Sequence, residues 1–242
     1  RIGQLRLVRV TVIHPNDECQ CEHIRLLDAP KPEPAVMDEA QAYSMKRAEE
    51  AMGQGPAGPR SLYTDVLLGS VIHEAALLRA LGLGLPKRTD FASVDPPLST
   101  TPASEPPRIL AVGMLPGGAQ LHLSWTWAPD FPEYFEEVMV IGSAGRMRLT
   151  MPGPYLPAHR SALTVESMVD GQRTTMTTQP AHSTAFVEEL RAFAQSVRNG
   201  GPNTCTIEGA GEDLVFLQQV ARAAADRAGL SVGGEAGLGA DS

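Results

Sequence analysis

Three consecutive β-hairpins are predicted between residues 108 and 178, and they restrict the possible folds more than any other feature of the sequence. In each hairpin, two stretches of β-forming residues flank a short turn that contains glycine. The turns fall at residues 116–118, 142–145 and 170–171. Strands joined by such short turns run antiparallel and lie side by side. We therefore predict an α+β architecture, an open and mostly antiparallel β-sheet with helices packed on one face.

Two more strands and four helices are expected outside the hairpins. The strands are residues 5–13, which are rich in β-branched side chains, and residues 87–94. The helices follow from helix-forming residues and from apolar residues at helical spacing, with Ser183 or Thr184 as a cap for the third one. They span residues 36–52, 61 to about 83, 184–199 and 208–228.

The second strand of the first hairpin has one strongly apolar face. That face holds Leu121, Leu123, Trp125 and Trp127, and polar side chains alternate with them on the other face. We expect the helices to cover the opposite face of the sheet and to leave this tryptophan row exposed. Because a large apolar surface is rarely left in contact with water, we expect copies of the chain to form a homo-oligomer through it.

The overall charge disfavours some partners. The chain has 28 acidic and 20 basic residues, a net charge of −8, whereas nucleic-acid binding needs clustered lysine and arginine. No apolar run approaches the roughly 20 residues of a membrane span. We therefore expect neither nucleic acid nor a membrane as a partner.

The three cysteines, Cys19, Cys21 and Cys205, are too few for a disulfide framework. Cys19 and Cys21 lie near His14 and His23, but this spacing is weak for a metal site, and we predict no metal. Reduced thiols and the lack of a signal-peptide pattern favour a cytoplasmic location.

A single histidine stands in the middle of the longest apolar-periodic segment, residues 61–84. Gly69 and Ser70 lie four and three residues before His73, so a helix places all three on one face. Glycine inside a helix costs roughly 1 kcal/mol relative to alanine, which indicates a close approach by a ligand or by another backbone. Taken alone, His73 fits either a hydrogen-bonded structural residue or a functional imidazole.

Four segments together resemble the C-terminal domain of the Gfo/Idh/MocA family, the group of glucose–fructose oxidoreductase and inositol dehydrogenase. IGQLRLV at residues 2–8 resembles the first strand of that domain, and GSVIH at residues 69–73 resembles its histidine helix. EEVMVIGSAGRMRL at residues 136–149 is similar to a hairpin of the family. Residues 186–194, followed by a helix end at Asn199 and Gly200, resemble the closing helices of the family's domain. Residues 208–209 belong to the same resemblance.

The resemblance covers nearly the whole chain and implies a fold like the C-terminal domain of glyceraldehyde-3-phosphate dehydrogenase. It implies that residues 1–232 form a substrate-binding and oligomerisation domain, with a long insert at about residues 16–59. Residues 233–242 are small and polar, and we expect them to form a flexible tail.

The family also places a Rossmann domain, with its NAD(P) site and a catalytic lysine, before the segment that starts here at Arg1. No Gly-x-Gly-x-x-Gly follows a strand at the N-terminus, and the glycines of residues 82–84 follow a helix instead. We therefore expect NAD or NADP as the cofactor, no cofactor-binding residues in this chain, and a Rossmann domain that was removed or is encoded separately.

By resemblance, the histidine helix lines the substrate pocket, and its histidine acts as the general acid–base or binds the reacting hydroxyl. This role falls to His73, because an imidazole titrates near neutral pH and can take the alcohol proton as hydride leaves. The family commonly has an aspartate four residues earlier, where this chain has Gly69. Asp65, one turn further back, can replace that carboxylate only if the helix directs it to the same site.

Other candidate substrate contacts are weaker. His14 and Asn16, at the end of the first strand, stand where the family often contacts substrate. Both residue types are also common in turns, so they fit a turn equally well. The side chain of Tyr63 either reaches the substrate pocket or packs in the hydrophobic core. Trp125 and Trp127 fit a sheet face or an interface better than a sugar-stacking platform. The carboxylates of residues 130–137 fit a solvated edge, and Arg79 fits a surface charge or an ion pair.

These expectations describe the substrate-binding domain of an NAD(P)-dependent oxidoreductase that acts on CH–OH groups of a sugar, a cyclitol or a similar polyhydroxylated small molecule. Alone, the chain is expected to lack redox activity. The alternative is a stand-alone, cofactor-free binding or scaffold protein derived from that family. A cofactor-free lyase or isomerase that uses His73 has less support.

Overall fold

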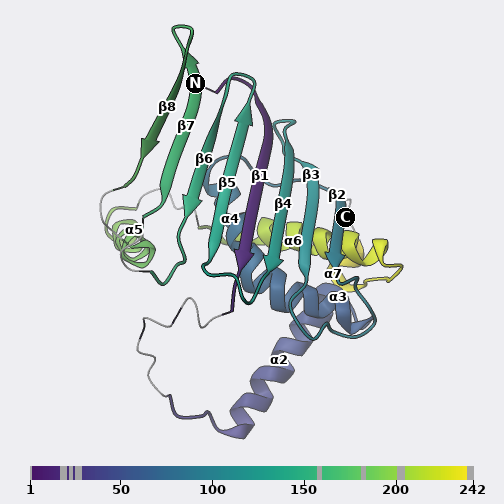
Figure 1. Cartoon of the computed structure of the whole chain (residues 1–242). Coiled ribbons are helices and arrows are strands. Elements are labelled where there is room, and N and C mark those ends of the chain that lie inside the picture. The colour runs from purple at the N-terminus through teal and green to yellow at the C-terminus, as the bar shows by residue number, and fades with distance from the viewer. Residues whose placement is uncertain are drawn as a thin grey trace.

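One eight-stranded sheet forms the frame of the molecule, in the order β2-β3-β4-β1-β5-β6-β7-β8 (Figure 1). The computed structural model describes residues 2–16, 21, 24, 29–156, 160–180, 184–200 and 205–238. Neighbouring strands are antiparallel except β1 and β4, which run parallel. The strands are β1 (Leu5–His14), β2 (Thr89–Asp95), β3 (Arg108–Met114), β4 (Gln120–Trp127), β5 (Phe135–Gly142), β6 (Gly145–Met151), β7 (Ala162–Val169) and β8 (Gln172–Thr178).

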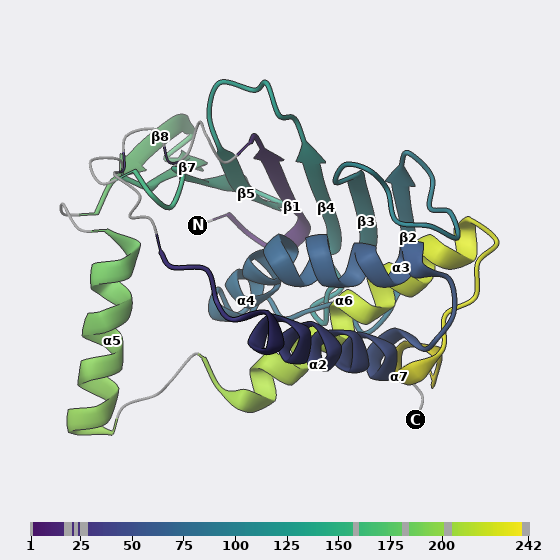
Figure 2. The ribbon, with the colours of Figure 1, turned by 90° about the horizontal axis from the view of Figure 1, so that it is seen from below.

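The helices lie mainly on one face of this sheet, which confirms the predicted α+β architecture (Figure 2). Helix α6 packs against β2, α4 and η1. The described helices are α2 (Pro34–Met52), α3 (Ala57–Ser61), η1 (Leu62–Val71), α4 (Ile72–Ala80), α5 (Ala185–Asn199), α6 (Ile207–Arg227) and α7 (Gly234–Leu238).

The predicted histidine helix is a continuous run of α3, η1 and α4 that begins four residues earlier and ends at Ala80. Its central part, η1, is a π-helix, in which the backbone bonds span five residues. The apolar stripe continues through this wider turn, since Leu67, Val71, Ala75 and Leu78 are all fully buried. π-Helical turns are frequent at functional sites.

The hydrophobic core lies between the helices and the middle strands. Alternate residues of β1, namely Val8, Val10 and Val12, are fully buried there. Leu67 and Leu78 from the histidine helix and Leu217 from α6 cover them in the same core cluster. A bidentate ion pair between Arg79 and Asp213 joins α4 to α6, with both N···O distances 2.7 Å.

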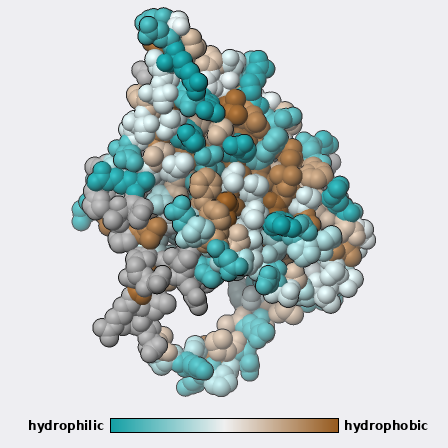
Figure 3. Space-filling view, viewed as in Figure 1, coloured by the Kyte–Doolittle hydropathy of each residue, from teal (hydrophilic) through white to brown (hydrophobic). Residues whose placement is uncertain are grey.

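The tryptophan row lies under the helices, so the expectation that it is exposed is wrong. Trp125 is 3% exposed, and its Nε1 donates a hydrogen bond to Ser70 Oγ in η1 at 2.8 Å. It pairs with Val12, which also belongs to the core face. The uncovered face of β4 carries the polar residues His122, Ser124 and Thr126. Figure 3 shows that this open face mixes polar and apolar patches.

The predicted turns and caps are present in the structure. Asp170 and Gly171 both have positive φ, as a two-residue hairpin turn requires. Thr184 caps α5 by accepting a hydrogen bond from the Val187 N–H, and Gly200 ends the helix in the left-handed region. Ser183 lies outside the described residues.

Two terminal segments differ from the sequence-based picture. The apolar stripe of α5, which includes Phe193 and Val197, is exposed, and the helix stands apart from the others (Figure 2). The tail expected to be flexible from Gly233 forms α7 over residues 234–238, because Ala236 is buried and the Gly233 N–H donates to Met52 O of α2. Residues 239–242 lie outside the described residues.

Candidate functional site

His73 is the second residue of α4, directly after the π-helix, and its side chain is exposed. Gly69 is also exposed, and nothing lies within 4 Å of the position that a Cβ would take there. The expected close approach to this glycine is therefore absent among the described residues. The helix instead leaves open space one turn before the imidazole.

His14 lies at the end of β1 inside a group of aromatic rings. Its ring centroid is 5.7 Å from that of Trp125, 5.6 Å from that of Trp127 and 5.6 Å from that of Tyr134. The ring stacks on Trp127, meets Tyr134 edge to face, and has Nδ1 2.8 Å from the carbonyl oxygen of Pro15. We call His14 with these three rings the aromatic box; its Trp125 is buried, and its other three rings are partly buried.

Tyr134 and Glu136, at the start of β5, bring an acidic group next to the aromatic box. The Tyr134 hydroxyl donates to Glu136 Oε2 at 3.0 Å. Burial raises the pKa of Glu136, while the Tyr134 hydrogen bond and the charge of His73 lower it. Burial also raises the pKa of Tyr134, so the phenol keeps its proton at neutral pH. The prediction that the carboxylates of this segment lie on a solvated edge is thus wrong for Glu136.

Glu74, the next residue after His73, is a buried carboxyl group. It is 1% exposed, and neither oxygen has a hydrogen-bond partner among the described residues. Burial first, and then the nearby charge of Glu136, raises the pKa of Glu74 from 4.5 to about 8. At neutral pH the site therefore holds a protonated acid, Glu74, near the Tyr134-bonded carboxyl of Glu136.

These residues meet because β1 and β4 are parallel. Both strands have their C-terminal ends on the same side of the sheet, where residues 14 and 127 pair. Ser70 holds the π-helix against this edge through its bond to Trp125. Glu74, Ser70, Tyr134 and Glu136 were not predicted from the sequence as site residues. The alternation of β5 carried a signal for the last two, since Tyr134 and Glu136 share their face with the buried Val138 and Val140.

Three other predicted residues lie elsewhere or contribute little to this cluster. Asp65 accepts hydrogen bonds from Ser61 and Thr64 and lines a separate pocket of about 210 Å³ beside residues 98–107. Tyr63 is buried towards α6, where Gln218 is its hydrogen-bond partner and burial raises its pKa. The Asn16 N–H donates to Pro129 O at 3.4 Å, next to the end of β1.

The described residues contain no group of three or more His, Cys, Asp or Glu side chains placed to hold a metal ion. Cys19 and His23 lie outside the described residues. Within that described part, no strand leads through a glycine-rich turn into a helix, and residues 82–84 follow α4. The described residues therefore do not fit the pyrophosphate of a dinucleotide.

The fold is a mostly antiparallel sheet with helices on one side, as in the glyceraldehyde-3-phosphate dehydrogenase-like C-terminal domain of oxidoreductases. No protein-family model and no curated protein matches the chain. None of the described helices is long and apolar enough to cross a membrane.

Solved structures of such oxidoreductases are similar to this chain. KijD10, a 3-ketoreductase from Actinomadura kijaniata in complex with NADP, is 15% identical, with a TM-score of 0.52 over 90% of this chain and 52% of that chain. GnnA, a UDP-N-acetylglucosamine 3-dehydrogenase from Acidithiobacillus ferrooxidans, is 13% identical, with a TM-score of 0.52 over 92% and 54%. A putative NADPH-dependent oxidoreductase from Desulfitobacterium hafniense is 15% identical, with a TM-score of 0.57 over 93% and 56%.

This chain thus spans about half the length of the structures that it matches. At these identities the similarity establishes the fold.

Proposed function

We propose that this chain is the substrate-binding domain of an NAD(P)-dependent oxidoreductase that acts on a sugar, a cyclitol or a related polyhydroxylated small molecule. The proposal rests on one observation. His73, Glu136, Tyr134 and the aromatic box lie together at the C-terminal ends of β1 and β4. The activities of two proteins with similar structures, a 3-ketoreductase and a UDP-N-acetylglucosamine 3-dehydrogenase, add support.

In this proposal, the aromatic box binds the carbon face of the sugar ring, and His73 accepts the hydroxyl proton as hydride leaves the carbon. The charge of His73 lowers the pKa of Glu136, so the imidazole and this carboxyl group interact electrostatically. Tyr134 holds that carboxylate in place through its hydroxyl. Glu74, which keeps its proton to about pH 8, adds no negative charge beside Glu136 at neutral pH.

NAD or NADP supplies the hydride acceptor in this proposal and binds to a nucleotide domain outside the described residues. The chain alone is therefore proposed to be inactive. The open sheet face, with its mixed patches, is proposed to form the contact in a homo-oligomer (Figure 3). The compartment is proposed to be the cytoplasm.

Tryptophan fluorescence tests substrate binding directly, because the chain has two tryptophans and both belong to the aromatic box. Titration with glucose, myo-inositol and UDP-N-acetylglucosamine should give a saturable change for at least one of them. His14→Ala should weaken this binding about tenfold or more. His122→Ala, on the open face of β4, is the matched control and should leave it unchanged. No saturable change with any of the three compounds would contradict the proposal.

A second function, a cofactor-free binding or scaffold protein, is favoured by one observation. The position of the family's aspartate is Gly69, and no described atom fills the space beside it. Saturable sugar binding without any NAD(P)-dependent oxidation, in a preparation that includes the nucleotide domain, would support this function. If oxidation is observed, His73→Ala should reduce kcat by roughly 100-fold.

A further inference from the structure

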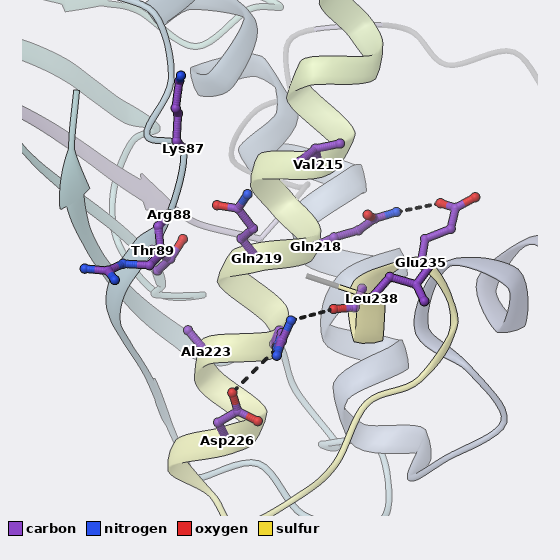
Figure 4. Close-up of a pocket in the computed structure, with 12 residues that line it drawn as sticks. Lys87, Arg88, Thr89, Val215, Gln218, Gln219, Ala223, Asp226, Glu235 and Leu238 are labelled. Carbon is purple, nitrogen blue, oxygen red and sulfur yellow. Dashed lines mark hydrogen bonds and ion pairs between the residues drawn. The ribbon is translucent and has the colours of Figure 1, made fainter. Parts of the chain in front are cut away.

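A second polar pocket lies on the far end of the helical layer, between α6, α7 and the start of β2 (Figure 4). Its volume is about 850 Å³, within the range of small-molecule sites. Its lining does not include any residue of the aromatic box, nor His73, Glu74 or Glu136.

Two residues that line this pocket each have a buried side-chain oxygen without a hydrogen-bond partner among the described residues. These oxygens are Thr89 Oγ1, at the start of β2, and Gln219 Oε1, in the middle of α6. The two side chains extend into the gap between β2 and α6 from opposite walls (Figure 4). Only four buried side-chain atoms of the described residues lack a partner, and the other two belong to Glu74. Since buried polar groups are nearly always paired, this pair indicates a missing polar ligand.

The chemistry of the two oxygens specifies the group that they would bind. An amide oxygen such as Gln219 Oε1 only accepts, so its partner must donate a hydrogen. A threonine hydroxyl can donate or accept. One hydroxyl group of a ligand satisfies both, because it can donate to Gln219 and accept from Thr89.

The charges around the pocket favour an anionic ligand. Lys87 makes no ion pair or hydrogen bond with the described residues. Across the pocket, Arg222 has a loose ion pair with Asp226 at 3.9 Å and donates to Ala236 O at 3.4 Å. The remaining acid, Glu235, accepts from Gln218 at 2.9 Å. Lys87 and Arg222 thus retain capacity for a negative group.

We propose that this pocket binds a small hydroxylated anion, a sugar acid or a sugar phosphate. A ligand hydroxyl pairs with Thr89 and Gln219, and the acidic group lies between Lys87 and Arg222. The apolar side chains of Val215 and Leu238 cover the carbon skeleton. This inference is independent of the proposed redox function, because the pocket shares no residue with the first site.

Isothermal titration calorimetry with four probes tests the proposal: gluconate, glucose 6-phosphate, inorganic phosphate and glucose. We expect gluconate or glucose 6-phosphate to bind at least tenfold more tightly than phosphate or glucose. The preferred probe distinguishes a sugar-acid site from a sugar-phosphate site. Tryptophan fluorescence should stay unchanged, since both tryptophans belong to the other site.

Gln219→Leu and Lys87→Ala should each weaken the preferred probe about tenfold, whereas Lys46→Ala on the exposed part of α2 should not. If Gln219→Leu does not fold, Thr89→Val replaces it. Three results would each overturn the proposal. They are equal affinity for phosphate and glucose 6-phosphate, an affinity that is unchanged in both pocket variants, and no binding of any probe.

Discussion

The buried carboxyl of Glu74 should make the stability of this protein depend on pH in an unusual direction. Its pKa is about 8 in the folded protein and 4.5 in an exposed chain. Between these values the folded state holds a proton that the unfolded state has released. The free energy of unfolding therefore falls as pH rises, by about 1.4 kcal/mol per pH unit, and levels off above the folded pKa.

The structure gives an order of magnitude for this effect. A shift from 4.5 to about 8 corresponds to about 5 kcal/mol in total, of which about 4 kcal/mol is lost between pH 5 and pH 8. Glu74→Gln removes the titrating proton and keeps the shape of the protonated acid. The variant should be no more stable than the parent at pH 5, and several kcal/mol more stable at pH 8.

Urea unfolding at pH 5, 6, 7 and 8 measures this difference. Glu133→Gln, at an exposed position, is the matched control and should keep the slope of the parent protein. If Glu74→Gln retains that slope as well, the carboxyl of Glu74 is not the group that titrates, and the assignment of a protonated acid beside Glu136 fails.

Three further predictions follow from single contacts. Gly69→Ala should raise the free energy of unfolding by up to about 1 kcal/mol in urea denaturation, because the site is open; a loss of stability would show that the glycine is needed. Arg79→Ala should lower it by about 3–5 kcal/mol, since the buried Asp213 loses its ion pair; a change below 1 kcal/mol would refute this. The isolated chain should bind no NADH at micromolar concentrations in calorimetry, and saturable binding would place a nucleotide site within it.

Local chemistry made much of the fold predictable. Turn residues such as Asp170 and Gly171, and caps such as Thr184, act within a few residues, so the sequence shows the hairpins and the helix ends directly. The existence of the histidine helix followed from its apolar periodicity in the same way. Its π-helical centre did not, because no simple residue pattern specifies bonds that span five residues.

The errors concern long-range packing. Alternation along β4 showed that Trp125 and Trp127 share a face, but which face the helices cover depends on the whole sheet. For the candidate site, the sequence pointed to His73 and His14. It gave no reason to bury Glu74, since carboxylates are rarely buried without a partner. Only the packing of η1 and α4 against the strand ends brings Glu74 and Glu136 together.

Strand β1 divides the sheet into two parts that share no other strand pairing. On one side lie β2, β3 and β4, and on the other lie β5 to β8, each a continuous meander. Val10 pairs with Leu123 on one flank and with Val138 on the other. A chain that has not yet inserted β1 would therefore expose two unpaired edges, at β4 and β5, and such edges promote aggregation. Because these contacts join residues more than one hundred positions apart, we expect the pairing of the first strand to slow folding.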